Sequence, residues 1–455
     1  MGRVTRELPT SFFLFDLPDI WGVIGYLKNC LIMKKFSLIS KLFVLVMLMF
    51  PFITFAQNHF IRGDADGNGK VSIDDVTCLI DYLLKGSWPE DQMMGDKIKV
   101  LFVGNSFTAN SVFYLPFIFK NGGLDRFKIA FMFSAGASLQ DYVGWFNSHA
   151  VVTYEYDSDK DVEWQNELRI PAATVADDDW DLIVLQQSSK SSIDMTSYMP
   201  YTTVLDSLIT NVMSGKSYQI GWNINHARGA VAYNYPLDIL ANIHNNCQTN
   251  GIGIVLPYGT AIFNALTVRS LRTAGGGFYR NLKHGDNTHL SPGLSMYIAS
   301  LAIAQALSDY FSLGFSAQND MTEPLEAWSD SSSDDYKGIS PTYGSFVAIT
   351  ENTRTIAKAA VAAAIASPFA ITQLNNEHLS VIYNCDGCHI EGDAPTSLNY
   401  GEKLSFRIVA DDGKEMQSVQ WRYDWRGVGI NYTLGADGLF EMAATDNLII
   451  TAVAI

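Results

Sequence analysis

The sequence predicts a three-layer α/β/α domain built on a parallel sheet, flanked by a small helix-and-loop module and an all-β module. Three observations lead to this fold class. Between residues 97 and 370, apolar strand-like runs alternate with helical periodicity, which is typical of a parallel sheet covered on both faces. An acidic, glycine-rich segment, 58–95, precedes this region. Short alternating strands separated by glycine and aspartate turns fill 373–455.

The length and composition of the chain are consistent with several domains, and its net charge argues against a nucleic-acid partner. The chain has 455 residues, too many for one ordinary domain, and 48% are hydrophobic, enough for a sizeable core. Its formal net charge of −16 would repel a phosphate backbone, so we expect no nucleic-acid partner.

The first segment, 1–57, reads as a leader. A basic stretch follows Met33, an apolar run covers Leu42–Phe52, and small residues precede Gln57, which together are typical of a signal peptide. Residues 1–32 look like translated upstream sequence, so we expect Met33 to be the true start. The alternative, a membrane anchor, is less favoured because the apolar run is short for a span. We therefore expect a secreted, periplasmic or cell-surface protein with no stable membrane span.

Residues 64–75, DADGNGKVSIDD, have the oxygen-ligand spacing of an EF-hand-like calcium loop, with Gly69 at the sharp turn. With the helical VTCLIDYLLKG that follows, the loop resembles a dockerin repeat. Only one repeat is present, where dockerins usually carry two, so a cohesin-like partner is a weaker expectation than structural calcium. A metal-free acidic turn is the alternative. The predicted ligands are Asp64, Asp66, Asn68, Lys70 (through its carbonyl), Ser72 and Asp75.

The α/β region is predicted to contain strands at 98–103, 182–186, 218–222 and 252–256, and helices at 294–307 and 353–366. The first strand runs into Gly-Asn-Ser in VLFVGNSFTAN. A serine at this place projects from the carboxyl edge of the sheet, beside unpaired N–H groups at a helix start. Ser106 is therefore a candidate nucleophile, although the motif by itself indicates only a helix N-cap.

A candidate base lies far along the chain, in DNTHLSPGL, residues 286–294. Asp286 and His289 are three residues apart on a loop, so the carboxylate could hold one imidazole nitrogen while the other takes a proton from a hydroxyl. Mere capping of the next helix is the alternative.

Together these motifs resemble the SGNH/GDSL hydrolase superfamily, in an uncharacterised bacterial branch with GNSF and LQQSS blocks. The resemblance implies a flavodoxin-like fold, with Ser106 as nucleophile, His289 as base and Asp286 as its orienting partner. It also implies oxyanion donors: the Ser106 N–H, the Gly136 N–H in SAGASLQDY, and the Gln187 amide. Gln187 stands where the family usually has an asparagine.

The resemblance implies a serine esterase that hydrolyses acyl esters through an acyl-enzyme, and the signal peptide predicts that it is secreted. Acetyl esters on carbohydrates are an expectation by analogy with the dockerin-like module, in which calcium would be structural. The alternative is a non-catalytic glycan- or surface-binding protein with a degenerate SGNH domain. His226 is a candidate for lining the pocket, although a structural role is favoured over a catalytic one. Arg228, Tyr258 and Trp222 are candidates for its rim.

The C-terminal region, 373–455, is predicted to be a small β-sandwich-like module. It contains Cys385-Asp-Gly-Cys388-His389, the C-x-x-C-H pattern of c-type haem attachment. Because these residues lie in strand-like sequence, we expect a local disulfide or free thiols rather than haem or another metal. Cys78 and Cys247 are expected to pack as small apolar residues.

Overall fold

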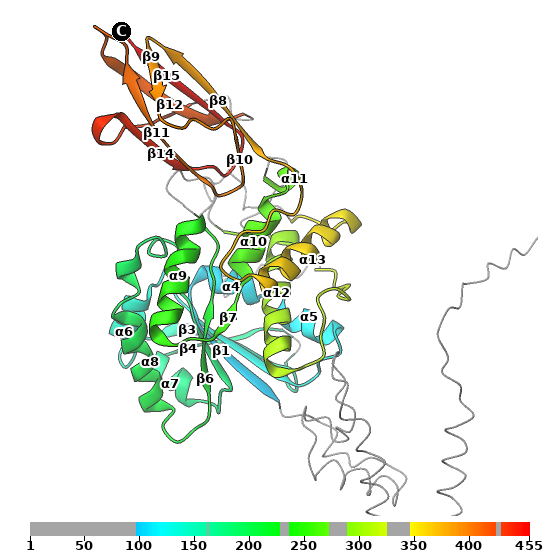
Figure 1. The fold of residues 1–455 in the computed structure, drawn as a ribbon. Helices are drawn as coiled ribbons and strands as arrows, with labels where there is room; N and C mark the ends of the chain where they lie inside the picture. Colours follow the sequence, from blue (N-terminus) through cyan, green and yellow to red (C-terminus); the bar gives the residue numbers. More distant parts are fainter. Residues whose placement is uncertain (1–96, 162, 228–235, 273–288, 325–345, 425–428) are drawn as a thin grey trace, which may run out of the picture. The chain divides into compact units, whose positions relative to one another are not determined.

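The computed structural model describes residues 97–455 apart from 162, 228–235, 273–288, 325–345 and 425–428. The leader and the predicted calcium loop lie outside the described residues. The described residues form an α/β region and a β-rich region (Figure 1).

The α/β region is built on a seven-stranded sheet with the order β4-β3-β2-β1-β5-β6-β7. Five strands, β2, β1, β5, β6 and β7, are mutually parallel, and β3 runs antiparallel to both of its neighbours. The parallel strands thus have a flavodoxin-like order, whose topological switch point lies between β1 and β5. The strands are β1 (Ile98–Gly104), β2 (Phe127–Phe133), β3 (Val151–Asp157), β4 (Gln165–Arg169), β5 (Leu182–Leu185), β6 (Gln219–Asn223) and β7 (Ile254–Leu256).

Helices cover both faces of this sheet, as the sequence predicts (Figure 1). One layer packs around α12, which contacts α4, α5, α10 and α13, and the other around α8, which contacts α6, α7 and α9. The helices are α4 (Ser106–Val112), α5 (Leu115–Asn121), α6 (Leu139–Trp145), α7 (Pro171–Ala176), α8 (Tyr201–Val212), α9 (Pro236–Asn250), α10 (Tyr258–Leu266), α11 (Arg269–Arg272), α12 (Leu294–Phe311) and α13 (Glu351–Ala366), with a short 3₁₀ turn η2 (Met195–Ser197).

The four predicted strands of this region are confirmed as β1, β5, β6 and β7, and the two predicted helices as α12 and α13. The sheet is larger than expected because β2, β3 and β4 extend it by three strands. The central strands β1 and β5 are almost wholly buried, since helices pack on both of their faces. The edge strand β4 is mostly exposed and polar, so it gave no apolar signal in the sequence.

The β-rich region has a five-stranded sheet, β10-β8-β15-β12-β13, and a three-stranded sheet, β14-β11-β9. Alternate side chains of β11 and β15 are buried in an apolar core that the two sheets share, as expected for a sandwich. The strands are β8 (Leu379–Asp386), β9 (Cys388–Glu391), β10 (Ser397–Leu398), β11 (Lys403–Ala410), β12 (Met416–Tyr423), β13 (Ile430–Asn431), β14 (Leu439–Ala443) and β15 (Leu448–Ala454), with a 3₁₀ turn η7 (Ala436–Gly438).

Within the described part of the chain, no helix has the length and apolar character needed to cross a membrane.

Candidate functional site

Ser106 lies where β1 passes into α4, at the carboxyl edge of the sheet and beside the switch point. Asn105 caps the helix: its Oδ1 accepts the N–H of Phe107 at 3.0 Å. Ser106 is half-buried, whereas every other residue of α4 is buried. The residues on either side of Ser106 are therefore buried, and the Ser106 hydroxyl stays at the surface of the site.

Gly104 is required by the close approach of α4 to the end of β1. A Cβ at this position would lie 1.9 Å from Thr108 Oγ1, well inside any real contact. The Thr108 hydroxyl in turn donates a hydrogen bond to Gln186, at the end of β5. The Gly104 carbonyl accepts a 2.6 Å hydrogen bond from the hydroxyl of Tyr142 on α6. The glycine thus lets the turn pack tightly against its neighbours on both sides.

Ser106 and His289 meet although 183 positions separate them in the sequence. His289 Nε2 lies 2.7 Å from Ser106 Oγ, within hydrogen-bonding distance, and His289 is also half-buried. This contact is the one that a serine nucleophile and its general base require. Asp286, the predicted orienting carboxylate, lies outside the described residues, so its role stays a prediction.

An aromatic cluster lies beneath this pair. The Phe107 ring stacks on the imidazole of His226, with centroids 4.0 Å apart, and meets His289 edge-on at 5.8 Å. Tyr258 also contacts His226, and its hydroxyl donates to the Phe107 carbonyl at 3.4 Å. His226, Tyr258 and Trp222 are all fully buried, so the expectation that they line a pocket or its rim is wrong. His226 and Tyr258 pack against Phe107 and each other instead, and Trp222, within β6, packs against Tyr198. Arg228 lies outside the described residues.

Asn105 connects the three loops that the sequence analysis singled out. Its Nδ2 donates to the carbonyl of Ala137 at 3.0 Å and to that of Gln187 at 3.5 Å. Gly136, next to Ala137, is exposed and has a φ of 70°, a conformation that glycine adopts readily. The Asn105 side chain, as the helix cap, accepts the N–H of Phe107.

Gln187 lies in the expected loop, but its hydrogen bonds do not fit an oxyanion donor. Its Nε2 donates to the carbonyl of Ser197 at 2.9 Å and to the Ser197 hydroxyl at 3.2 Å. Its Oε1 accepts the N–H groups of Leu139 at 3.2 Å and Ser188 at 2.7 Å. Both amide hydrogens of this buried side chain are engaged, because the longer glutamine folds back onto its own loop. In this structure the Gln187 amide is therefore committed to Ser197, which disfavours the expected role as an oxyanion donor.

The sequence analysis missed the roles of Asn105, Phe107 and Asn110. Asn105 and Phe107 flank the candidate nucleophile, and the Gly-Asn-Ser-Phe motif was their only signal. Asn110 Oδ1 accepts the backbone N–H of Leu290 at 3.2 Å, a long-range contact with no counterpart in local sequence.

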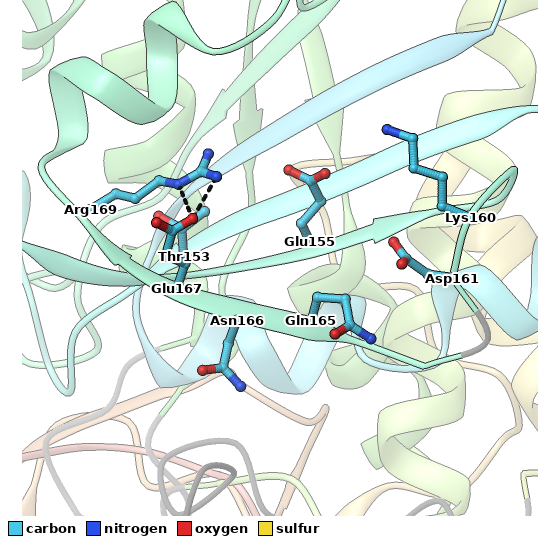
Figure 2. Close-up of a pocket in the computed structure, with 8 residues that line it drawn as sticks. All are labelled: Thr153, Glu155, Lys160, Asp161, Gln165, Asn166, Glu167 and Arg169. Atoms are coloured by element: carbon cyan, nitrogen blue, oxygen red, sulfur yellow. Dashed lines mark hydrogen bonds and ion pairs between the residues drawn. The ribbon is translucent and has the colours of Figure 1, made fainter.

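Figure 2 shows a separate polar cleft of about 180 Å³ on β3, β4 and the turn between them. Its charged groups pair within the protein: Arg169 with Glu167 and Asp177, and Glu155 with Lys128. None of the predicted site residues lines this cleft. The lining residues are Thr153, Glu155, Lys160, Asp161, Gln165, Asn166, Glu167 and Arg169.

The C-x-x-C-H residues lie at the turn from β8 to β9, in strand structure as expected. Cys385 and Cys388 are free thiols; Cys385 is exposed, whereas Cys388 packs into the sandwich core. Burial raises the pKa of the Cys385 thiol, and the adjacent Cys388 thiol raises it further. Thioether links to one haem need both sulfurs at the surface, so this pair does not fit haem. Cys247 is buried as predicted, and burial raises its pKa to about 12.

The residues of the described segments contain no group of three or more His, Cys, Asp or Glu side chains placed to hold a metal ion. The predicted calcium ligands, from Asp64 to Asp75, lie outside these segments.

Comparison with known proteins gives fold-level similarity only. No family model matches the chain, and no curated protein matches it. Among solved structures, it is similar to a DUF4886 family protein from Bacteroides uniformis, with 23% identity, a TM-score of 0.48, and coverage of 61% of this chain and 98% of that one. It is also similar to a protein from Slackia heliotrinireducens provisionally described as an SGNH hydrolase, with 15% identity, a TM-score of 0.30, and coverage of 47% and 100%. Similarity this low carries no argument about activity, so function has to be argued from the chain's own residues.

Proposed function

We propose that the α/β region is a serine hydrolase of the SGNH/GDSL type that cleaves acyl esters. One observation carries the proposal: the 2.7 Å contact between Ser106 Oγ and His289 Nε2 at the carboxyl edge of the sheet. Open α/β sheets bind their ligands at this edge, next to the switch point. The two residues are 183 positions apart in the sequence, so local helix capping does not account for their meeting.

In the proposed mechanism Ser106 Oγ attacks the acyl carbon while His289 Nε2 accepts its proton. The N–H groups of Ser106 and Gly136 are proposed to donate to the oxyanion. Gly136 is a candidate because the carbonyl of its neighbour Ala137 accepts a hydrogen bond from Asn105, the residue before the nucleophile. His289 then returns the proton to the leaving alcohol, and an activated water hydrolyses the acyl-enzyme. Asp286 is proposed to orient the imidazole through its other nitrogen.

The proposed substrates are acyl esters on carbohydrates or related small esters, acetyl esters among them. This choice depends on the dockerin-like sequence and therefore on analogy. We also propose that the protein is exported through its leader, and that the loop 64–75 binds Ca²⁺ in a structural role. Acetate release from a panel of acetylated polysaccharides would test the substrate class: no release from any of them would contradict it.

The activity is tested by turnover of p-nitrophenyl acetate. Ser106→Ala and His289→Ala should each lower kcat by about a thousandfold or more, because the nucleophile and base act as a unit. Ser207→Ala, on the exposed face of α8, is the matched control and should be unchanged. Equal rates for wild type and Ser106→Ala would refute the esterase and favour the alternative, a glycan-binding protein without catalysis.

A further inference from the structure

Three side chains along α4 and the turn that follows it contact one segment, 289–293. Ser106, Asn110 and Tyr114 are spaced four residues apart, so on a helix they form a single row. Ser106 Oγ meets His289 Nε2 at 2.7 Å, Asn110 Oδ1 accepts from the N–H of Leu290 at 3.2 Å, and the Tyr114 hydroxyl accepts from the N–H of Gly293 at 3.0 Å. Successive turns of α4 and the turn after it thus contact successive residues of the segment 289–293.

Asn110 is the member of this row that holds the backbone of the histidine segment. Its side chain is 1% exposed, and the N–H that it accepts belongs to the residue directly after His289. The peptide group that links His289 to Leu290 is therefore hydrogen-bonded to α4, the helix that carries Ser106.

The far end of the row is fixed separately. Ser300 on α12 donates to the carbonyl of Ser111 at 2.7 Å and accepts the N–H of Tyr114 at 3.3 Å. Asn110 takes no part in these two hydrogen bonds, so we expect its loss to leave the α4–α12 packing in place and to act mainly on the His289 end. This separates a positioning effect from a general loosening of the fold.

We propose that Asn110 is a positioning residue that sets the distance between Ser106 and His289. The inference rests on the proposed hydrolase function, since positioning has a consequence only if Ser106 is a nucleophile. Its physical reason is that a displacement of about 1 Å at a reacting pair can lower the rate about a hundredfold. An amide oxygen is suited to this place because it can satisfy a buried backbone N–H without carrying charge.

The test uses a fluorophosphonate probe, which needs no knowledge of the natural substrate. Ser106 Oγ forms a bond to phosphorus, fluoride leaves, and the serine proton passes to His289, so the labelling rate reports the activated pair. Asn110→Leu keeps the volume and removes the acceptor. Its labelling rate should fall at least about tenfold at saturating probe, with little change in the probe's apparent affinity.

Two variants separate positioning from stability. Asn246→Leu removes another fully buried asparagine, on α9 where it accepts from Thr202, and should lower the melting temperature without changing the labelling rate. Asn110→Asp keeps an acceptor oxygen for the N–H of Leu290 and should regain a labelling rate within about threefold of wild type.

The outcomes are distinct. An Asn110→Leu protein that is labelled as fast as wild type, whatever its melting temperature, overturns the inference. Wild type labelled no faster than Ser106→Ala would instead refute the proposed function. In that case crystal structures decide the positioning: an unchanged distance between Ser106 Oγ and His289 Nε2 in Asn110→Leu overturns it, and a longer distance supports it.

Discussion

Gln187 was expected to be an oxyanion donor, but its buried side-chain amide hydrogen-bonds within the protein. We therefore expect its removal to lower stability more than activity. In Gln187→Ala, the N–H groups of Leu139 and Ser188 and the carbonyl of Ser197 lose their side-chain partner. Each such bond contributes roughly 1 kcal/mol net, and a buried group left without a partner costs about 1–3 kcal/mol. The cavity left by the side chain adds to this. We therefore expect the free energy of unfolding to fall by about 3 kcal/mol or more.

The assay is urea unfolding followed by fluorescence, together with the rate of fluorophosphonate labelling under conditions where the variant is fully folded. Because the Gln187 amide is committed to Ser197, labelling by the folded protein should fall by less than about tenfold. An oxyanion donor would cost roughly a hundredfold or more. Gln140→Ala, at an exposed glutamine on α6, should change stability by no more than about 0.5 kcal/mol.

The reasoning would be refuted by either of two results for Gln187→Ala. One is a stability loss below about 1 kcal/mol, which would mean that the four hydrogen bonds are replaced by water at little cost. The other is a hundredfold loss of labelling rate in folded protein, which would restore the amide to the oxyanion site.

Two further predictions concern pH and calcium. Burial acts to raise the pKa of Asp178, but hydrogen bonds from Lys99 and Lys128 outweigh it and lower the pKa from 3.8 to about 2. Since the folded-state pKa is the lower one, this carboxylate contributes stability above about pH 4, and that stability is lost as the pH falls towards 2. Urea unfolding at pH 5 and pH 3 should show a smaller loss for Asp178→Asn; equal losses in both proteins would contradict this. Isothermal titration of the full chain with Ca²⁺ should show one site that Asp64→Ala abolishes, and undiminished binding by that variant would rule out the proposed loop.

The fold class and part of the site follow from local sequence. Uninterrupted apolar runs such as LIVL can only be buried strands or short buried helix pieces, and their alternation with helical periodicity selects a parallel sheet. The edge strand β4, QNELR, escaped notice because only burial on at least one face creates a hydrophobic period, and four of its five residues are exposed. In the β-rich region, β10 and β13 have two residues each, too few to show a period.

The sequence by itself determined which residues have the chemistry of a nucleophile and a base, Ser106 and His289, because Gly-Asn-Ser after a strand and Asp-x-x-His before a helix are local patterns. Only the tertiary structure decided which other side chains contact this pair and the segments that carry it. It committed the Gln187 amide to Ser197, placed His226 beneath Phe107 and gave Asn110 a partner 180 positions away. The physical reason is that a hydrogen bond requires its donor and acceptor to lie at the right separation to within a few tenths of an ångström; packing sets that separation, and no local pattern encodes it.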